Sequence, residues 1–110
     1  MGDVLGYYNS YKRIHFIHIN NSISDSLQKF VCAHELGHAI LHHDANTPFL
    51  KKNTFYSTEK IEAEANAFAV ELLIPDEVVY EYKDTSVTIN EVAEIYGVPK
   101  EVSHLKLINM

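Results

Sequence analysis

Two histidines four residues apart, His34 and His38, constrain the fold of this 110-residue chain more than any other feature. Apolar residues recur around them at the spacing of one helix face, at Phe30, Ala33, Gly37, Ile40 and Leu41. On a helix the two imidazoles lie ~40° apart around the axis and ~6 Å apart along it, so both can bind one zinc ion. We therefore expect a helix from about Ser26 to about His43, capped by Ser24 or Asp25.

Glu35 follows the first histidine and completes the pattern H-E-x-x-H. It flanks the face that carries His34 and His38, so its carboxylate can approach a metal ion without being a ligand. Zinc lowers the pKa of bound water toward ~7, and a nearby carboxylate can then accept the proton. The motif predicts zinc ligands at His34 and His38 and a general base at Glu35.

A catalytic zinc site needs a third protein ligand and one open position. His42 lies ~12 Å along the axis from His34, and His43 points away, so neither can join His34 on one ion. The longer pattern H-E-x-x-H-x-x-G-x-x-H is also absent, because Leu41 and Asp44 stand where it requires glycine and histidine. The third ligand is therefore expected from another element.

A second helix is expected to supply that ligand. Glu62 and Asn66 lie four residues apart on one face, so Glu62 can bind zinc while Asn66 accepts a hydrogen bond from a ligand imidazole. Glu64 points ~160° away from Glu62, so the two cannot share the metal. Glu62 is favoured as the ligand, with Glu64 as the alternative.

This second helix has clear boundaries in the sequence. Ser57 or Thr58 is expected to cap it, and Pro75 to stop it after Ile74. Residues 54–56 before it are expected to form a short strand. Its core stripe is predicted at Ile61, Ala65, Phe68 and Leu72.

The whole pattern predicts an α+β fold in a single domain, residues 1–110, because a chain of this length has room for one hydrophobic core. Aromatic and β-branched residues dominate positions 4–20, which predicts a hairpin broken at Asn9-Ser10. A small antiparallel sheet would then pack beside the two metal-bearing helices, with a core of about residues 4–75.

Residues 76–110 are expected to form a helical C-terminal extension. A short helix is predicted at 76–82, a second between the capping box of Thr88 with Glu91 and the stop at Gly97, and a third at 100–107. Their apolar side chains are expected to complete the core: Val92, Ile95, Val98, Val102 and Leu105.

Charge and composition exclude several classes of partner. The net charge of −6 disfavours nucleic-acid binding. Residues 88–105 resemble a helix-turn-helix, but 76–101 contain only Lys83 and Lys100 as cations. No apolar run approaches the ~20 residues of a membrane span, and no signal peptide is evident, so a cytoplasmic protein without membrane association is expected. The single cysteine, Cys32, fits a reducing compartment and is expected in the core.

Two segments together, H-E-L-G-H-A-I-L-H-H and E-A-E-A-N-A-F-A-V-E-L-L-I-P, resemble the ImmA/IrrE family of metallopeptidases over about residues 30–75. The resemblance implies one zinc ion per chain, held by His34, His38 and a glutamate of the second segment, with Glu35 as base. It further implies a protein substrate, a helix-turn-helix transcriptional repressor of a phage or mobile element.

Two questions stay open at this point. The rival function is a binding module that holds zinc and recognises a regulator without cutting it. No residue is assigned to stabilise the oxyanion, for which Tyr56, Tyr80 and His104 are candidates. His15 and His18 are interpreted as strand residues, and the oligomeric state is not predicted.

Overall fold

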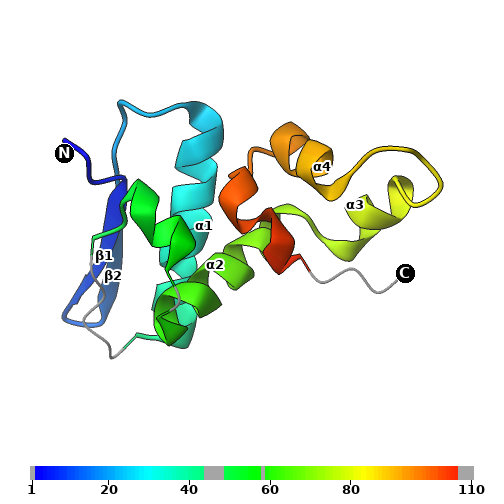
Figure 1. Ribbon diagram of the computed structural model, residues 1–110. Helices are drawn as coiled ribbons and strands as arrows, with labels where there is room; N and C mark the ends of the chain where they lie inside the picture. The colour runs from blue at the N-terminus through cyan, green and yellow to red at the C-terminus, as the bar shows by residue number, and fades with distance from the viewer. Residues whose placement is uncertain (1, 44–48, 58, 107–110) are drawn as a thin grey trace.

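The chain forms a hairpin, two long helices that cross, and a group of short helices, in a computed structural model that describes residues 2–43, 49–57 and 59–106 (Figure 1). The elements are β1 (Gly6–Tyr11), β2 (Ile14–Ile19), α1 (Asp25–Leu41), η1 (Lys52–Tyr56), α2 (Lys60–Leu73), α3 (Asp76–Glu81), α4 (Ile89–Ile95) and η2 (Lys100–Leu105). The hairpin lies on one side of α1 and the C-terminal helices lie beyond α2. This arrangement confirms the predicted α+β fold with a helical C-terminal extension.

The hairpin turns at Lys12-Arg13, because Tyr11 pairs with Ile14 in the antiparallel register. Both turn residues have positive φ, 50° and 69°, as in the two-residue turns that match the twist of paired strands. The predicted break at Asn9-Ser10 was wrong, since both of these residues lie within β1. Polar composition suggested that break, whereas the geometry of the strand pair decides where the chain reverses.

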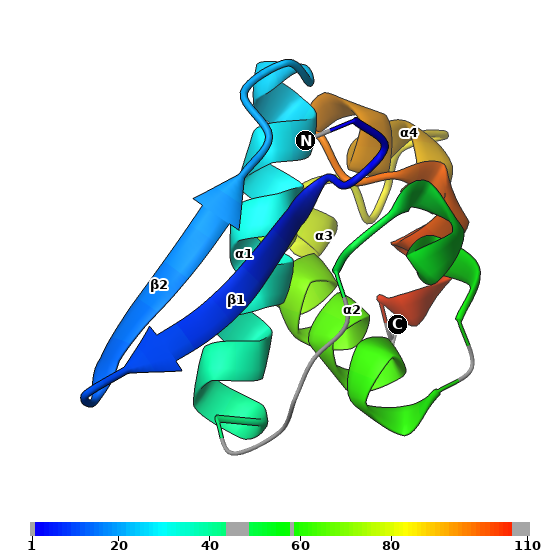
Figure 2. The same cartoon turned by 90° about the vertical axis from the view of Figure 1, so that its left-hand side faces the viewer.

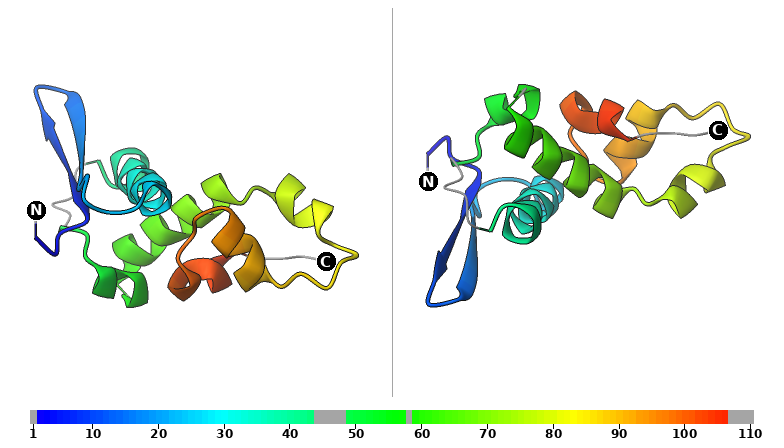
Figure 3. Two further views of the ribbon diagram at one scale, coloured as in Figure 1. Left: turned by 90° about the horizontal axis from the view of Figure 1, so that it is seen from above. Right: turned by 90° about the horizontal axis from the view of Figure 1, so that it is seen from below.

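Gly6 lets the hairpin approach α1. A Cβ atom at this position would lie 2.5 Å from Val31 Cγ1 of α1 and 2.7 Å from the carbonyl oxygen of His18. Leu50 pairs with the chain at the start of β1, where the Leu5 N–H donates to the Leu50 carbonyl at 2.7 Å and the Leu50 N–H donates to the Gly6 carbonyl at 2.8 Å. Figures 2 and 3 show the result, a two-stranded sheet beside α1 whose far end extends away from the helices.

Helix α1 begins after Ser24, whose hydroxyl accepts a hydrogen bond from the Leu27 N–H at 3.2 Å. Its buried face consists of Phe30, Val31, Ala33, His34, Glu35, Gly37 and His38. Ile40 and Leu41 were predicted on this face but are about half exposed, because they lie at its edge and in the last turn. Cys32 was predicted in the core but is exposed, because it points away from the buried face.

The N-cap residue of helix α2 is Glu59, whose side chain makes no capping hydrogen bond among the described residues, so the predicted cap at Ser57 was wrong. The Ser57 hydroxyl instead accepts a hydrogen bond from the Glu59 N–H at 3.1 Å, before the helix begins. Thr58, the other predicted cap, lies outside the described residues. The predicted buried face of α2 was wrong in part, because Ala65 is buried as predicted but Leu72 is half exposed. The buried residues are Glu62, Ala65, Asn66, Ala69 and Val70. Residues 54–56 belong to the 3₁₀ helix η1 and not to a strand.

The C-terminal helices close the core. The predicted capping box is present, with the Thr88 hydroxyl accepting from the Glu91 N–H at 3.2 Å, and Gly97 follows α4 with φ of 75°. Val92, Val98 and Val102 are buried as predicted, Leu105 is partly buried, and Ile95 is 61% exposed. No helix in the described part of the chain is long and apolar enough to cross a membrane.

Candidate metal centre

Helices α1 and α2 approach each other closely at Gly37, the glycine of the H-E-x-x-H segment. A Cβ atom there would lie 3.1 Å from Cδ1 of Phe68 and 3.3 Å from its Cβ and Cγ. Carbon atoms in favourable contact are about 3.5–4.0 Å apart, so a larger residue at 37 would push the helices apart. The glycine therefore allows the histidines of α1 to face the glutamate of α2.

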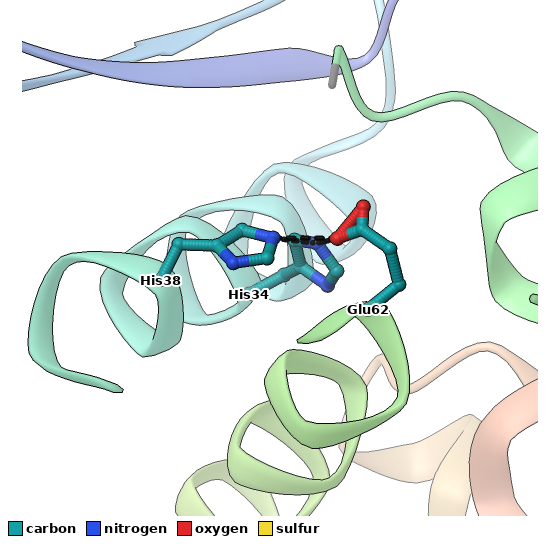
Figure 4. Close-up of side chains that lie close together, drawn as sticks. All are labelled: His34, His38 and Glu62. Carbon is teal, nitrogen blue, oxygen red and sulfur yellow. Dashed lines mark hydrogen bonds and ion pairs between the residues drawn. The ribbon is translucent and has the colours of Figure 1, made fainter. Parts of the chain in front are cut away.

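Three buried side chains converge between these helices (Figure 4). Glu62 Oε1 lies 2.6 Å from His38 Nε2 and 3.3 Å from His34 Nε2, and the two nitrogens are 3.1 Å apart. His34 and His38 are fully buried, and Glu62 is 2% exposed. Two imidazole nitrogens and one carboxylate oxygen form the ligand set of many three-ligand zinc sites, so this group is able to hold a metal ion.

Three buried carboxylate oxygens at this site have no hydrogen-bond partner in the described part of the chain, which also favours a bound cation. Glu62 Oε2 and both carboxylate oxygens of Glu35 are buried without a hydrogen-bond partner among the described residues. An unpaired buried carboxylate oxygen is costly, and a bound cation removes that cost.

Glu35 lies next to the convergent group and is fully buried. Burial raises the pKa of its carboxyl to about 7; the charge of His38 opposes this effect and that of Glu62 adds to it. A carboxyl group with a pKa near neutrality can both accept and return a proton, as a general base and acid must.

Glu62 shows the opposite shift. Burial alone would raise its pKa, but hydrogen bonds and charge interactions with His34 and His38 outweigh burial and lower the pKa to about 2. Its carboxylate is therefore ionised at neutral pH, as a metal ligand must be. The pKa values of the two carboxyl groups differ because, of the two, only Glu62 lies within hydrogen-bond distance of the imidazoles.

Asn66 contacts the His34 ring at Nδ1, the nitrogen that does not face Glu62. Its amide nitrogen donates to the Thr54 carbonyl at 3.3 Å, so its Oδ1 faces His34 Nδ1 at 2.8 Å and must accept from it. A proton on Nδ1 leaves the Nε2 lone pair of a neutral His34 available to a metal ion.

His42 and Glu64 lie outside the convergent group but are linked to it. His42 Nδ1 lies 3.0 Å from His38 Nδ1, and His42 Nε2 lies 3.1 Å from Glu64 Oε1. Sequence reasoning excluded His42 as a ligand that shares the ion with His34, kept Glu64 as the alternative to Glu62, and missed this contact. The available signal was the four-residue spacing of His38 and His42 on one helix face.

A pocket of about 590 Å³ opens beside Glu62. It lies between η1 and the beginning of α2. Its lining residues are Phe49, Lys51, Asn53, Thr54, Ser57, Glu59 and Glu62.

The three candidates for oxyanion stabilisation are not among the residues that line this pocket. Tyr56 and Tyr80 are 70% and 72% exposed, and His104 is exposed on η2. The strand histidines bind within the hairpin, His15 to the Tyr8 hydroxyl at 2.7 Å and His18 to Asn9 at 2.9 Å.

A family model and two curated proteins are similar to this chain. The family model described as the IrrE N-terminal-like domain matches residues 1–107. An uncharacterized immunity region protein 2 of Bacillus phage phi105 is 51% identical over 94% of this chain and 66% of its own length. Metallopeptidase ImmA of Bacillus subtilis (strain 168) is 34% identical over 84% of this chain and 55% of its own length. No solved structure matches the chain significantly. The chain thus spans less than two thirds of the length of these curated relatives.

Proposed function

Because this chain belongs to the ImmA/IrrE family of metallopeptidases, we propose that it is a zinc-dependent endopeptidase that cuts a helix-turn-helix repressor of a phage or mobile element. The observation that carries the proposal is the buried convergence of His34, His38 and Glu62 with Glu35 beside it. Each part of the proposal has its own support.

The ligands would be His34 Nε2, His38 Nε2 and a carboxylate oxygen of Glu62, the three groups that face one another. Three protein ligands leave a coordination position open, as catalytic zinc sites require. Bound zinc would polarise the scissile carbonyl and activate water. Asn66 would keep the His34 ring in the tautomer that presents Nε2.

Glu35 would transfer the protons of the reaction. Its carboxylate would accept a proton from the attacking water and then donate it to the amine of the leaving peptide. Its position directly after His34 on α1 and its pKa of about 7 support both steps. The same features argue against a module that only binds, because such a module gains nothing from an unpaired buried carboxylate.

A repressor substrate is supported by the relatives and by the shape of the site. One relative is named for a phage immunity region and another is named a metallopeptidase. The pocket at Glu62 is an open depression on the surface and not an enclosed chamber, so selectivity would have to come from the partner's fold. A folded repressor with one exposed, extended linker would meet this requirement.

The test is incubation of the purified protein with the repressor encoded beside its gene, followed by intact-mass analysis. We expect a single cut, abolished by chelator, restored by zinc and absent with Glu35→Gln. Glu94→Gln, an exposed glutamate of α4, should cut normally. Casein and short generic peptides should be cut weakly or not at all.

Two results would contradict the proposal. Broad digestion of unfolded proteins without preference for the repressor would reject the proposed substrate. Zinc binding without cleavage of any of these proteins would favour the binding module.

A further inference from the structure

We propose that His42 and Glu64 are positioning residues of the metal centre, which hold the His38 ring so that its Nε2 lone pair is available to a metal ion. The inference deepens the proposed function, because it presumes that His38 is a metal ligand. It assigns a role to two residues that would not themselves touch the metal.

The contacts form a chain across the two helices. His38 Nδ1 lies 3.0 Å from His42 Nδ1, one turn further along α1, and His42 Nε2 lies 3.1 Å from Glu64 Oε1 on α2. The His42 side chain is 8% exposed and that of Glu64 is 46% exposed. This series of contacts therefore runs from the buried metal centre to the protein surface.

The chemistry of the three groups fixes the direction of the hydrogen bonds. A carboxylate can only accept, so the proton between His42 and Glu64 belongs to His42 Nε2. The other nitrogen of a neutral His42 ring then carries a lone pair and accepts from His38 Nδ1. With its proton on Nδ1, a neutral His38 has its lone pair on Nε2, the atom that would bind a metal ion together with Glu62 Oε1, 2.6 Å away.

The two histidines of the motif are thereby held in the same way by different partners. His34 donates from Nδ1 to Asn66, and His38 donates from Nδ1 to His42. The contacts of both histidines lead to α2, those of His34 through Asn66 and those of His38 through Glu64. Helix α2 therefore orients both imidazoles in addition to supplying Glu62. Outer hydrogen bonds of this kind set the tautomer of a metal-binding histidine and raise its basicity.

The first measurement is zinc affinity, by competition with a chromophoric chelator. His42→Ala and Glu64→Ala should each weaken zinc binding by about 10- to 100-fold. His42→Gln should recover most of the loss, because its amide oxygen can accept from His38 Nδ1. His104→Ala and Glu94→Ala, exposed residues of η2 and α4, should bind zinc as the parent protein does.

The second measurement distinguishes positioning from a general loss of structure. In the ¹⁵N-labelled protein saturated with zinc, we expect a slowly exchanging imidazole N–H signal at His38 Nδ1. His42→Ala should lose this signal to solvent exchange even when zinc is bound, while the backbone amide spectrum stays that of a folded protein.

The outcomes separate this inference from the proposed function. If the parent protein binds no zinc, the proposed function fails and this inference fails with it. If the parent binds zinc, but both alanine variants match its affinity within twofold and the His38 signal persists, only this inference is overturned. If His42→Ala does not fold, Glu64→Ala decides, because Glu64 is half exposed and its loss leaves the helix contact intact.

Discussion

Replacing Gly37 with alanine is expected to weaken metal binding more than it weakens the fold. The added methyl would lie 3.1–3.3 Å from three carbons of Phe68, against a favourable distance of about 3.5–4.0 Å. Relief requires a shift of a few tenths of an ångström between α1 and α2. Metal–ligand distances are held to about ±0.2 Å, so the same shift moves Glu62 out of position relative to His34 and His38.

The free energy of unfolding should change little, because two effects oppose each other. Alanine is favoured over glycine within a helix by about 1 kcal/mol, whereas overpacking in a core costs about 1–3 kcal/mol. We therefore expect Gly37→Ala to lose about 0–2 kcal/mol of stability in chelator, measured by urea denaturation. Zinc affinity should fall about 10-fold or more in a chelator competition.

A double variant provides the control for this reasoning. Phe68→Ala removes two of the three crowded carbons, so Gly37→Ala combined with Phe68→Ala should bind zinc more tightly than Gly37→Ala alone. A Gly37→Ala protein that is more stable than the parent and binds zinc equally well would refute the link between helix spacing and the metal site.

Three further predictions concern other parts of the molecule. The Glu35→Gln variant should still fold and still bind zinc, while its rate of repressor cleavage should fall by about 10²-fold or more. Loss of zinc from this variant would instead show that Glu35 is a metal ligand. Lys106 is buried and binds Glu71 at 2.8 Å and Asp76 at 2.7 Å, but these two carboxylates are 48% and 86% exposed, so Glu71→Gln combined with Asp76→Asn should lower the free energy of unfolding by only about 1 kcal/mol, and Lys106→Met by less. Burial lowers the pKa of Lys106, but its hydrogen bonds to Asp76 and Glu71 prevail and raise it. This contribution should therefore be constant from about pH 6, where both carboxylates are ionised, to the ordinary lysine pKa of about 10.4, and it should be lost as the pH rises through the folded value. A deficit that disappears between pH 7 and 9 would contradict it. Truncation at Asp84 should lower the melting temperature markedly, because it removes the buried Val92, Val98 and Val102, and an unchanged melting curve would show that these residues do not complete the core.

Sequence reasoning succeeded where local periodicity decides the structure. Helix α1 and the shared face of His34 and His38 follow from helical spacing, and the capping box of Thr88 with Glu91 follows from a local exchange of hydrogen bonds. The placement of Glu62 on the face that meets α1 was also accessible from its spacing to Asn66.

The features that were not predicted depend on contacts between elements. The turn at Lys12-Arg13 carries no compositional signal, because lysine and arginine rarely adopt positive φ. The stripe of α2 was displaced because its buried face includes the polar Glu62, which a search for apolar residues overlooks. The link from His42 to Glu64 depends on the crossing of two helices, which no periodicity specifies.

The most direct test of the account is the zinc content of the chain and its variants after equilibrium dialysis at saturating zinc. We expect close to one zinc per chain for the parent and for Glu64→Ala, and a large loss for His34→Ala, His38→Ala and Glu62→Ala. A parent protein without zinc, or a Glu62→Ala protein that keeps its zinc while Glu64→Ala loses it, would contradict the metal centre proposed for this fold.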